Sequence, residues 1–243
     1  MGYVETADAR LHYEVSGTGE ALVLLHGNSE NLDYFAAQVP AFAERYRVVA
    51  LDTRAHGEST RGDGPLDFER LADDVCVVLD TLGIDSAHVL GYSDGGNTAL
   101  TLALRHPERV RSLIVNSANL DPSSLPWKFR IPVTLAWLLG ALVMPLSSTL
   151  ARKREVLGLM VLHPHIPVGR LGTIAVPTLV IAGERDVIPR GHTELIANSI
   201  PGAELTIVPD AGHPCARQRP EFFNASVLDF LDCANGRGAN GSG

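Results

Sequence analysis

Short runs dominated by apolar residues recur along the chain, and segments with a helical pattern separate most of them. The runs span residues 21–25, 47–51, 87–90, 112–115, 177–181 and 204–208. Because these runs are continuous rather than alternating, they indicate strands that are covered on both faces. Helices are expected between them at residues 68–82, 97–105 and 191–199. The sequence therefore predicts an α/β fold with a mostly parallel, twisted sheet and helices on both faces.

The N-terminal segment precedes this alternation. Residues 3–15 are expected to form an antiparallel hairpin at one edge of the sheet, with residues 16–19, Ser-Gly-Thr-Gly, as its turn. The first twenty residues carry several charges and no apolar run, so they do not resemble a signal peptide. We therefore expect a cytoplasmic protein.

Composition narrows the class of protein further. The chain has 243 residues, of which 45% are hydrophobic, and this is enough for one folding unit with a sizeable core. A net charge of −8 argues against binding nucleic acid through phosphate contacts. The three cysteines, Cys76, Cys215 and Cys233, are widely spaced and are expected to be reduced thiols. The sequence leaves open whether the protein is a monomer or a homodimer.

About sixty residues separate the fourth and fifth runs, and they are expected to hold a small helical cap at residues 121–170. Two helices are predicted there, at 132–145 and 148–162, with Pro132 starting the first helix and Pro145 ending it. The first is too short for the ~20 residues that span a bilayer, so no integral membrane segment is expected. Residues 1–120 and 171–233 would then form the core, and 234–243 a flexible tail. Residues expected to line a substrate pocket are Trp137, Leu138 and Met144.

A sharp turn follows the third run. It reads Gly91-Tyr92-Ser93-Asp94-Gly95 and leads into a helical pattern, which is the strand-turn-helix context of a G-x-S-x-G nucleophile. The glycines allow the turn to be tight enough for the Ser93 hydroxyl to stand clear of the backbone. Ser93 is therefore the candidate nucleophile.

A serine nucleophile needs a base, and the base needs a group that orients it. Asp186 and His213 each come just past the end of a predicted strand, as Ser93 does, and open α/β sheets place their sites at these ends. The backbone N–H groups of Asn28 and Asp94 are the candidate oxyanion donors. Asn28 belongs to a loop that directly follows the first run.

The chain resembles the α/β-hydrolase fold superfamily over residues 3–233. The motifs that carry this resemblance are His26-Gly27-Asn28, the turn at residues 52–59, Gly91 to Gly96, Gly183 to Asp186, and Gly212-His213. The Ser-Asp-Gly-Gly sequence is similar to that of biphenyl-hydrolase-like small serine esterases. The resemblance implies Ser93 as nucleophile, His213 as general base and acid, and Asp186 as its orienter, with no metal or cofactor. The loop after Gly27 is not a glycine run, which argues against esterases with a triple-glycine oxyanion loop.

These observations predict a carboxylesterase that cleaves small to medium carboxylic esters through an acyl-enzyme. Amide or thioester hydrolysis, carbon–carbon bond hydrolysis and perhydrolysis are the alternative reactions. A low-turnover ligand receptor, and a lipid-surface protein that uses the apolar cap helix, are the alternatives outside catalysis. The cap segment holds six basic and two acidic residues, although the rest of the chain is acidic. This contrast favours substrates with an apolar chain and a neutral or anionic end, unless the charges are simply solvated.

Several residues admit a structural role beside a functional one. Asp94 could contact a cationic substrate group or pack into its turn, and Cys215 could be reactive or merely small. The turn residues Arg54, His56 and Ser59 are expected to be structural. His163-Pro164-His165 looks like a metal pair, but no carboxylate or cysteine set accompanies it, so a metal role is not expected.

Overall fold

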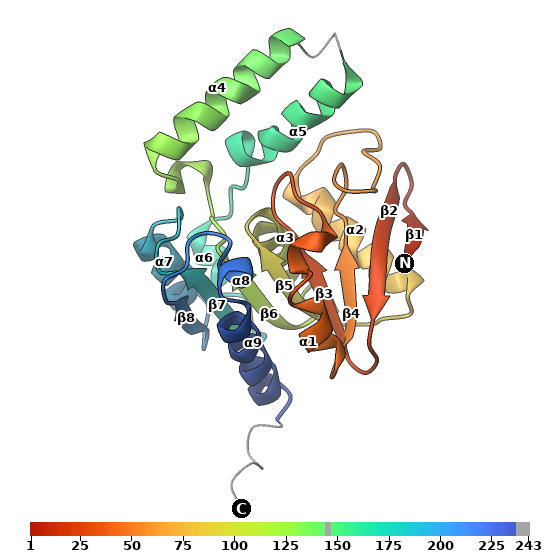
Figure 1. Ribbon diagram of the computed structural model, residues 1–243, viewed down its shortest axis with the longest axis vertical. Helices are drawn as coiled ribbons and strands as arrows, with labels where there is room; N and C mark the ends of the chain where they lie inside the picture. The colour runs from red at the N-terminus through yellow and green to blue at the C-terminus, as the bar shows by residue number, and fades with distance from the viewer. Residues whose placement is uncertain (144–146, 237–243) are drawn as a thin grey trace, which may run out of the picture.

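The computed structural model describes residues 1–143 and 147–236, which form one eight-stranded sheet with helices around it (Figure 1). The strands are β1 Gly2–Glu5, β2 Arg10–Ser16, β3 Ala21–Leu25, β4 Arg47–Leu51, β5 Ala87–Tyr92, β6 Val110–Asn116, β7 Thr178–Gly183 and β8 Glu204–Val208. The α-helices are α1 Val39–Ala43, α2 Phe68–Thr81, α3 Asp94–Arg105, α4 Trp127–Val143, α5 Ser148–Leu162, α6 Val168–Leu171, α7 Arg190–Ser199, α8 Cys215–Gln218 and α9 Pro220–Ala234. Short 3-10 helices are η1 Leu32–Phe35, η2 Pro107–Arg109 and η3 Pro122–Ser124.

The strand order is β1-β2-β4-β3-β5-β6-β7-β8. Strand β2 pairs antiparallel with both of its neighbours, and the pairs from β4 to β8 are parallel. All six predicted strands are present, so the prediction of a mostly parallel α/β sheet is confirmed. Strand β5 extends two residues further than predicted and ends directly before Ser93.

The predicted edge hairpin exists, but its predicted turn is wrong. Strands β1 and β2 are joined by residues 6–9, where the N–H of Thr6 donates to the carbonyl of Ala9 and the Thr6 hydroxyl accepts the Ala9 N–H. Residues 17–20 instead lead from β2 to β3, which are not neighbours, because β4 lies between them. Gly17 has a φ of +76°, and a Cβ there would lie 2.3 Å from the Ala43 carbonyl oxygen. Gly17 therefore belongs to the connection that passes β4 on its way from β2 to β3, and not to a hairpin turn.

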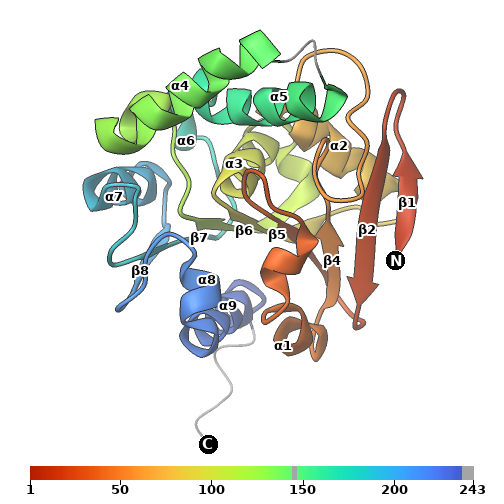
Figure 2. The same cartoon turned by 45° about the horizontal axis from the view of Figure 1, so that its top comes forward.

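Helices cover both faces of the sheet (Figures 1 and 2). Alternate residues of each strand point to opposite faces, so Val23 and Leu25 join one apolar cluster and Leu22 and Leu24 join the other. Helices α2, α3 and α7 contribute to the first cluster, and α1 and α9 contribute to the second. This two-sided burial explains why the sequences of β3 to β7 are apolar without alternation. For β8 the predicted burial is wrong, because this strand lies at the edge of the sheet and its Glu204 and Leu205 are exposed.

Helices α4 and α5 lie beside each other above the edge of the sheet where β5, β6 and β7 end (Figures 1 and 2). The bounds predicted for α5 are confirmed, whereas the predicted start of the preceding helix at Pro132 is wrong. That helix begins at Trp127, because the Pro126 carbonyl accepts the N–H groups of both Phe129 and Arg130 and so forms its first turn. Within the described residues, no helix is long and apolar enough to cross a membrane.

Candidate active site

The turn between β5 and α3 holds Ser93 in a backbone conformation that few residues adopt, with φ +54° and ψ −117°. The residues two positions before and two positions after Ser93 must be glycines. A Cβ on Gly91 would lie 2.0 Å from the Gly95 carbonyl oxygen, and a Cβ on Gly95 would lie 2.0 Å from the Leu25 carbonyl oxygen. The Ser93 N–H is anchored on the Asn116 carbonyl of β6 at 2.8 Å. The turn is therefore fixed from both sides, and the serine hydroxyl projects from it.

The three residues from separate strand ends lie together. His213 Nε2 is 3.0 Å from Ser93 Oγ, and His213 Nδ1 is 2.7 Å from Asp186 Oδ1. Asp186 follows β7 and His213 follows β8. A Cβ on Gly183 would lie 2.2 Å from the Gly212 carbonyl oxygen, so the two loops that carry Asp186 and His213 are packed directly against each other. The arrangement has the geometry of a nucleophile, a base and an orienting carboxylate.

Asp186 is held in its charged form. Burial alone would raise the pKa of its carboxyl group, but the hydrogen bond and charge of His213, the Ser117 hydroxyl and the N–H of Ile188 outweigh burial and lower that pKa. The backbone N–H of Ile188 donates to Asp186 Oδ1 at 2.9 Å. An ionised Asp186 accepts the Nδ1 proton of His213, which leaves Nε2 free to accept the proton of Ser93.

The loop after β3 lies directly against the start of α3. A Cβ on Gly27 would lie 2.9 Å from the Tyr92 ring, so this loop approaches β5 closely only because residue 27 is glycine. The side-chain amide of Asn28 donates through Nδ2 to Asp94 Oδ2 at 2.8 Å and to the Val156 carbonyl of α5 at 2.8 Å. Asn28 thus connects the loop, the nucleophile turn and α5. The N–H of Asp94 is the first in α3, where helical N–H groups have no partner inside the helix.

Asp94 is only 7% exposed. Burial raises the pKa of its carboxyl group to about 6, although the hydrogen bond from Asn28 and the charge of His213 act in the opposite direction. The side chain therefore changes its charge near neutral pH, directly beside the serine.

An apolar cavity of about 290 Å³ opens at Ser93 and His213. The remaining lining residues are Asp94, Asn119, Leu125, Lys128, Phe129, Pro132, Val133, Met160, Val187 and Ile188. The predicted pocket residues Trp137 and Leu138 do not line it. Trp137 stacks on the Arg154 guanidinium, 4.5 Å away, and Leu138 is 51% exposed. The third, Met144, lies outside the described residues.

The sequence missed the true lining for a geometric reason. The first two turns of α4 overlie the serine, and its later turns contact α5 instead. Two of the lining residues could be predicted from their place in the sequence, because Val187 and Ile188 directly follow the predicted site residue Asp186. Asn119 offered a weaker signal, since it comes just after the end of β6.

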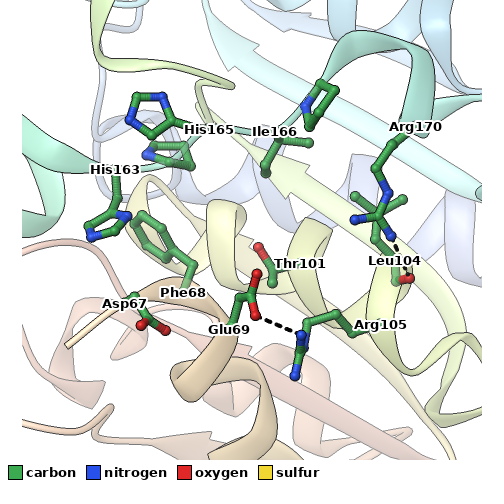
Figure 3. Close-up of a pocket in the computed structure, with 12 residues that line it drawn as sticks. Asp67, Phe68, Glu69, Thr101, Leu104, Arg105, His163, His165, Ile166 and Arg170 are labelled. Carbon is green, nitrogen blue, oxygen red and sulfur yellow. Dashed lines mark hydrogen bonds and ion pairs between the residues drawn. The ribbon is translucent and has the colours of Figure 1, made fainter. Parts of the chain in front are cut away.

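A second cavity, of about 210 Å³, lies away from the triad between α2, α3 and the segment after α5 (Figure 3). Two of its lining side chains, Glu69 and Arg105, form an ion pair at 2.7 Å. His163 and His165 lie here, but their ring centroids are 6.4 Å apart and His165 pairs with Asp121 at 2.7 Å. Within the described residues, no group of three or more His, Cys, Asp or Glu side chains is arranged to hold a metal ion.

Arg54 and Cys215, for which the sequence allows a functional or a structural role, both lie in surroundings that indicate a structural role. Arg54 is buried and binds both carboxylate oxygens of Asp74, at 2.6 and 2.8 Å. Cys215 is fully buried, and burial raises the pKa of its thiol to about 12. Its Sγ accepts a hydrogen bond from the Asn116 amide at 3.2 Å. A thiol with that pKa is a poor nucleophile.

Residues 20–142 match the family model described as the α/β hydrolase fold. The chain belongs to this family. It is 31% identical to a protein named putative carbamate hydrolase RutD from Azorhizobium caulinodans, and the match covers 95% of this chain and 98% of that protein. It is 30% identical to the human serine hydrolase BPHL, over 91% of this chain and 83% of the relative.

Solved structures of the family have the same fold. Est816, described as an N-acyl homoserine lactone degrading enzyme, superposes with a TM-score of 0.81 at 29% identity, and the match covers 94% of this chain and all of Est816. The expected resemblance to the α/β-hydrolase fold and to BPHL-type serine hydrolases is therefore confirmed. The relatives support hydrolase activity in this family, and their names differ in substrate.

Proposed function

We propose that the protein is a serine hydrolase that cleaves small to medium carboxylic esters, cyclic esters included, through an acyl-enzyme. One observation carries this proposal. His213 Nε2 lies 3.0 Å from the Ser93 hydroxyl while its Nδ1 lies 2.7 Å from the buried Asp186 carboxylate. A side chain with only a structural role has no need of this double contact at the floor of an apolar cavity.

The geometry supports a two-step acyl transfer. His213 Nε2 takes the Ser93 proton as Oγ bonds to the carbonyl carbon of the ester. The tetrahedral intermediate collapses, the bond to the alcohol oxygen breaks, and His213 gives the same proton to that oxygen. Water then attacks the acyl-enzyme with His213 as base, which releases the acid and restores Ser93.

The developing oxyanion would be held by the backbone N–H groups of Asn28 and Asp94. Loss of such a donor typically costs ~2.7–4 kcal/mol of transition-state stabilisation. The close packing of Gly95 against the Leu25 carbonyl supports this assignment, because it holds the loop and the nucleophile turn in fixed register. The positive end of α3 points to the same place.

The cavity supports the choice of substrate class. Its volume of about 290 Å³ and its wall of Leu125, Phe129, Val133 and Met160 suit a short or medium acyl chain or an aryl group. Among the relatives, the description of Est816 names a lactone, which is a cyclic carboxylic ester. These observations support an ester as substrate, and the name of the RutD relative makes a carbamate the competing substrate class.

A series of p-nitrophenyl esters of increasing chain length, with a small lactone and an aryl carbamate, tests the proposal. We expect turnover to peak at short or medium chains and to vanish in Ser93→Ala. A preference for the longest chains would contradict the size argument. Exclusive turnover of the carbamate, of a carbon–carbon bond substrate, or of peroxide with a carboxylic acid would contradict the ester assignment. Binding without turnover would indicate a receptor.

A further inference from the structure

One face of α4 carries a row of large apolar side chains that nothing in the described chain covers. Trp127, Ile131, Leu135 and Leu138 follow one another at intervals of four, four and three residues, so they share one side of the helix. Their exposed fractions are 71%, 49%, 52% and 51%. We call these four residues the α4 stripe. Leu139 lies beside it and is 61% exposed.

The stripe differs from the other exposed apolar residues of the described chain. Tyr3, Val168, Leu195, Leu205 and Phe222 lie singly on separate elements, β1, α6, α7, β8 and α9, and Met1 precedes β1. Phe129, Leu150 and Leu162 are exposed as well and lie on the cap helices α4 and α5, so the cap is the part of the described chain where exposed apolar side chains gather. Single exposed apolar residues are ordinary, but a contiguous row indicates an interaction surface. Residues 237–243, Arg-Gly-Ala-Asn-Gly-Ser-Gly, carry no large apolar side chain that could cover it.

The charges around the stripe indicate what it contacts. Helix α4 contains no acidic residue, and its two charged residues, Lys128 and Arg130, lie next to Trp127 and Ile131. Both cations are exposed, and in the described residues neither has a carboxylate within 4 Å. The segment of residues 121–170 holds six basic and two acidic residues. Two copies of this chain that paired through the stripe would therefore bring like charges together.

We propose that the α4 stripe rests on an anionic lipid surface, with Trp127 and the leucines in the interfacial region and the two cations at the headgroups. An apolar row with a tryptophan and flanking cations is the composition of helices that lie in a bilayer interface. The adjoining side of α4 supplies Phe129, Pro132 and Val133 to the cavity at Ser93, and Lys128, which also lines the cavity, lies between that side and the stripe. Docking would therefore bring the mouth of the cavity close to the lipid.

Co-sedimentation of the full chain with vesicles tests this docking. We expect binding to vesicles of equal amounts of phosphatidylcholine and phosphatidylglycerol, weaker binding in high salt, and little binding to phosphatidylcholine alone. The double variant Leu135→Ser/Leu138→Ser should lower the partition coefficient about tenfold or more, because it removes two of the apolar side chains that enter the lipid interface. Lys128→Gln/Arg130→Gln should remove most of the preference for phosphatidylglycerol. The matched control is Leu205→Ser/Phe222→Ser, which should bind as the parent does.

Tryptophan emission gives a readout that is specific to the stripe, because the two tryptophans of the chain are both on α4. In Trp137→Phe only Trp127 remains, and its emission should shift to the blue when anionic vesicles are added. In Trp127→Phe only Trp137 remains, and its emission should hardly move, since it packs on Arg154.

Three results would overturn the proposal. The first is no binding to anionic vesicles by protein whose circular dichroism shows it to be folded. The second is binding that the stripe variants leave unchanged. The third is a concentration-dependent dimer in light scattering that Leu135→Ser/Leu138→Ser abolishes, without vesicle binding; this would assign the stripe to a second copy. None of these readouts depends on hydrolase activity.

Discussion

Asp94 offers a prediction whose magnitude follows from its burial. Burial raises the pKa of its carboxyl group from 3.8 to about 6. Each pKa unit corresponds to 1.36 kcal/mol, so the ionised side chain destabilises the folded state by about 3 kcal/mol. Between pH 3.8 and about 6 the folded state binds more protons than the unfolded state. Stability therefore falls as pH rises through this window, and the whole penalty is present above it.

The substitution Asp94→Asn removes the charge and keeps an oxygen that can accept the Asn28 amide. We expect it to raise the free energy of unfolding by up to about 3 kcal/mol near pH 8, and by almost nothing near pH 4. Urea unfolding followed by circular dichroism at both pH values measures the difference. The control is Asp229→Asn, on the exposed face of α9, which should change stability by less than about 0.5 kcal/mol at either pH. An equal gain at both pH values, or no gain near pH 8, would refute the reasoning.

Three further substitutions test the packing of the site and of the buried Arg54–Asp74 pair. Gly95→Ala places a methyl group 2.0 Å from the Leu25 carbonyl oxygen and should destabilise the fold by about 3 kcal/mol, whereas Gly191→Ala, with nothing within 4 Å, should be neutral or slightly stabilising in thermal melts. Arg54→Met leaves the Asp74 carboxylate buried without its partner, so urea unfolding should show a loss of about 3–5 kcal/mol. Unchanged stability would contradict the structural role of Arg54. Asn28→Ala leaves the Asp94 carboxylate and the Val156 carbonyl without their amide, and a loss of about 1–3 kcal/mol is expected in the same assay.

The sheet and the triad residues were accessible from the sequence because local patterns determine them. Continuous apolar runs mark strands that are covered on both faces, and the glycines around Ser93 mark a turn too tight for a Cβ. Asp186 and His213 were found by their position just past strand ends. In a parallel sheet, these ends share one edge, so residues distant in sequence come together there.

The remaining features depend on contacts that the chain makes at long range. Gly17 and Gly19 are typical of a turn, so the local sequence predicts the hairpin turn at residues 16–19. Strand β2 pairs with β4, however, and this segment therefore connects β2 to β3, which is not its neighbour in the sheet. The lining of the cavity depends on how α4 is rotated against α5, and an almost uniformly apolar helix does not indicate its rotation. The burial of Asp94 under the Asn28 amide follows from the same packing.

The proposed mechanism requires that Ser93 be a nucleophile activated by His213. The most direct measurement is covalent labelling with a fluorophosphonate probe, followed by intact-mass spectrometry and peptide mapping. We predict one adduct on the peptide that contains Ser93, no adduct in Ser93→Ala, and labelling in His213→Ala that is slower by at least about a thousandfold. Labelling of another residue, or an unmodified mass for folded protein after prolonged exposure, would contradict the account.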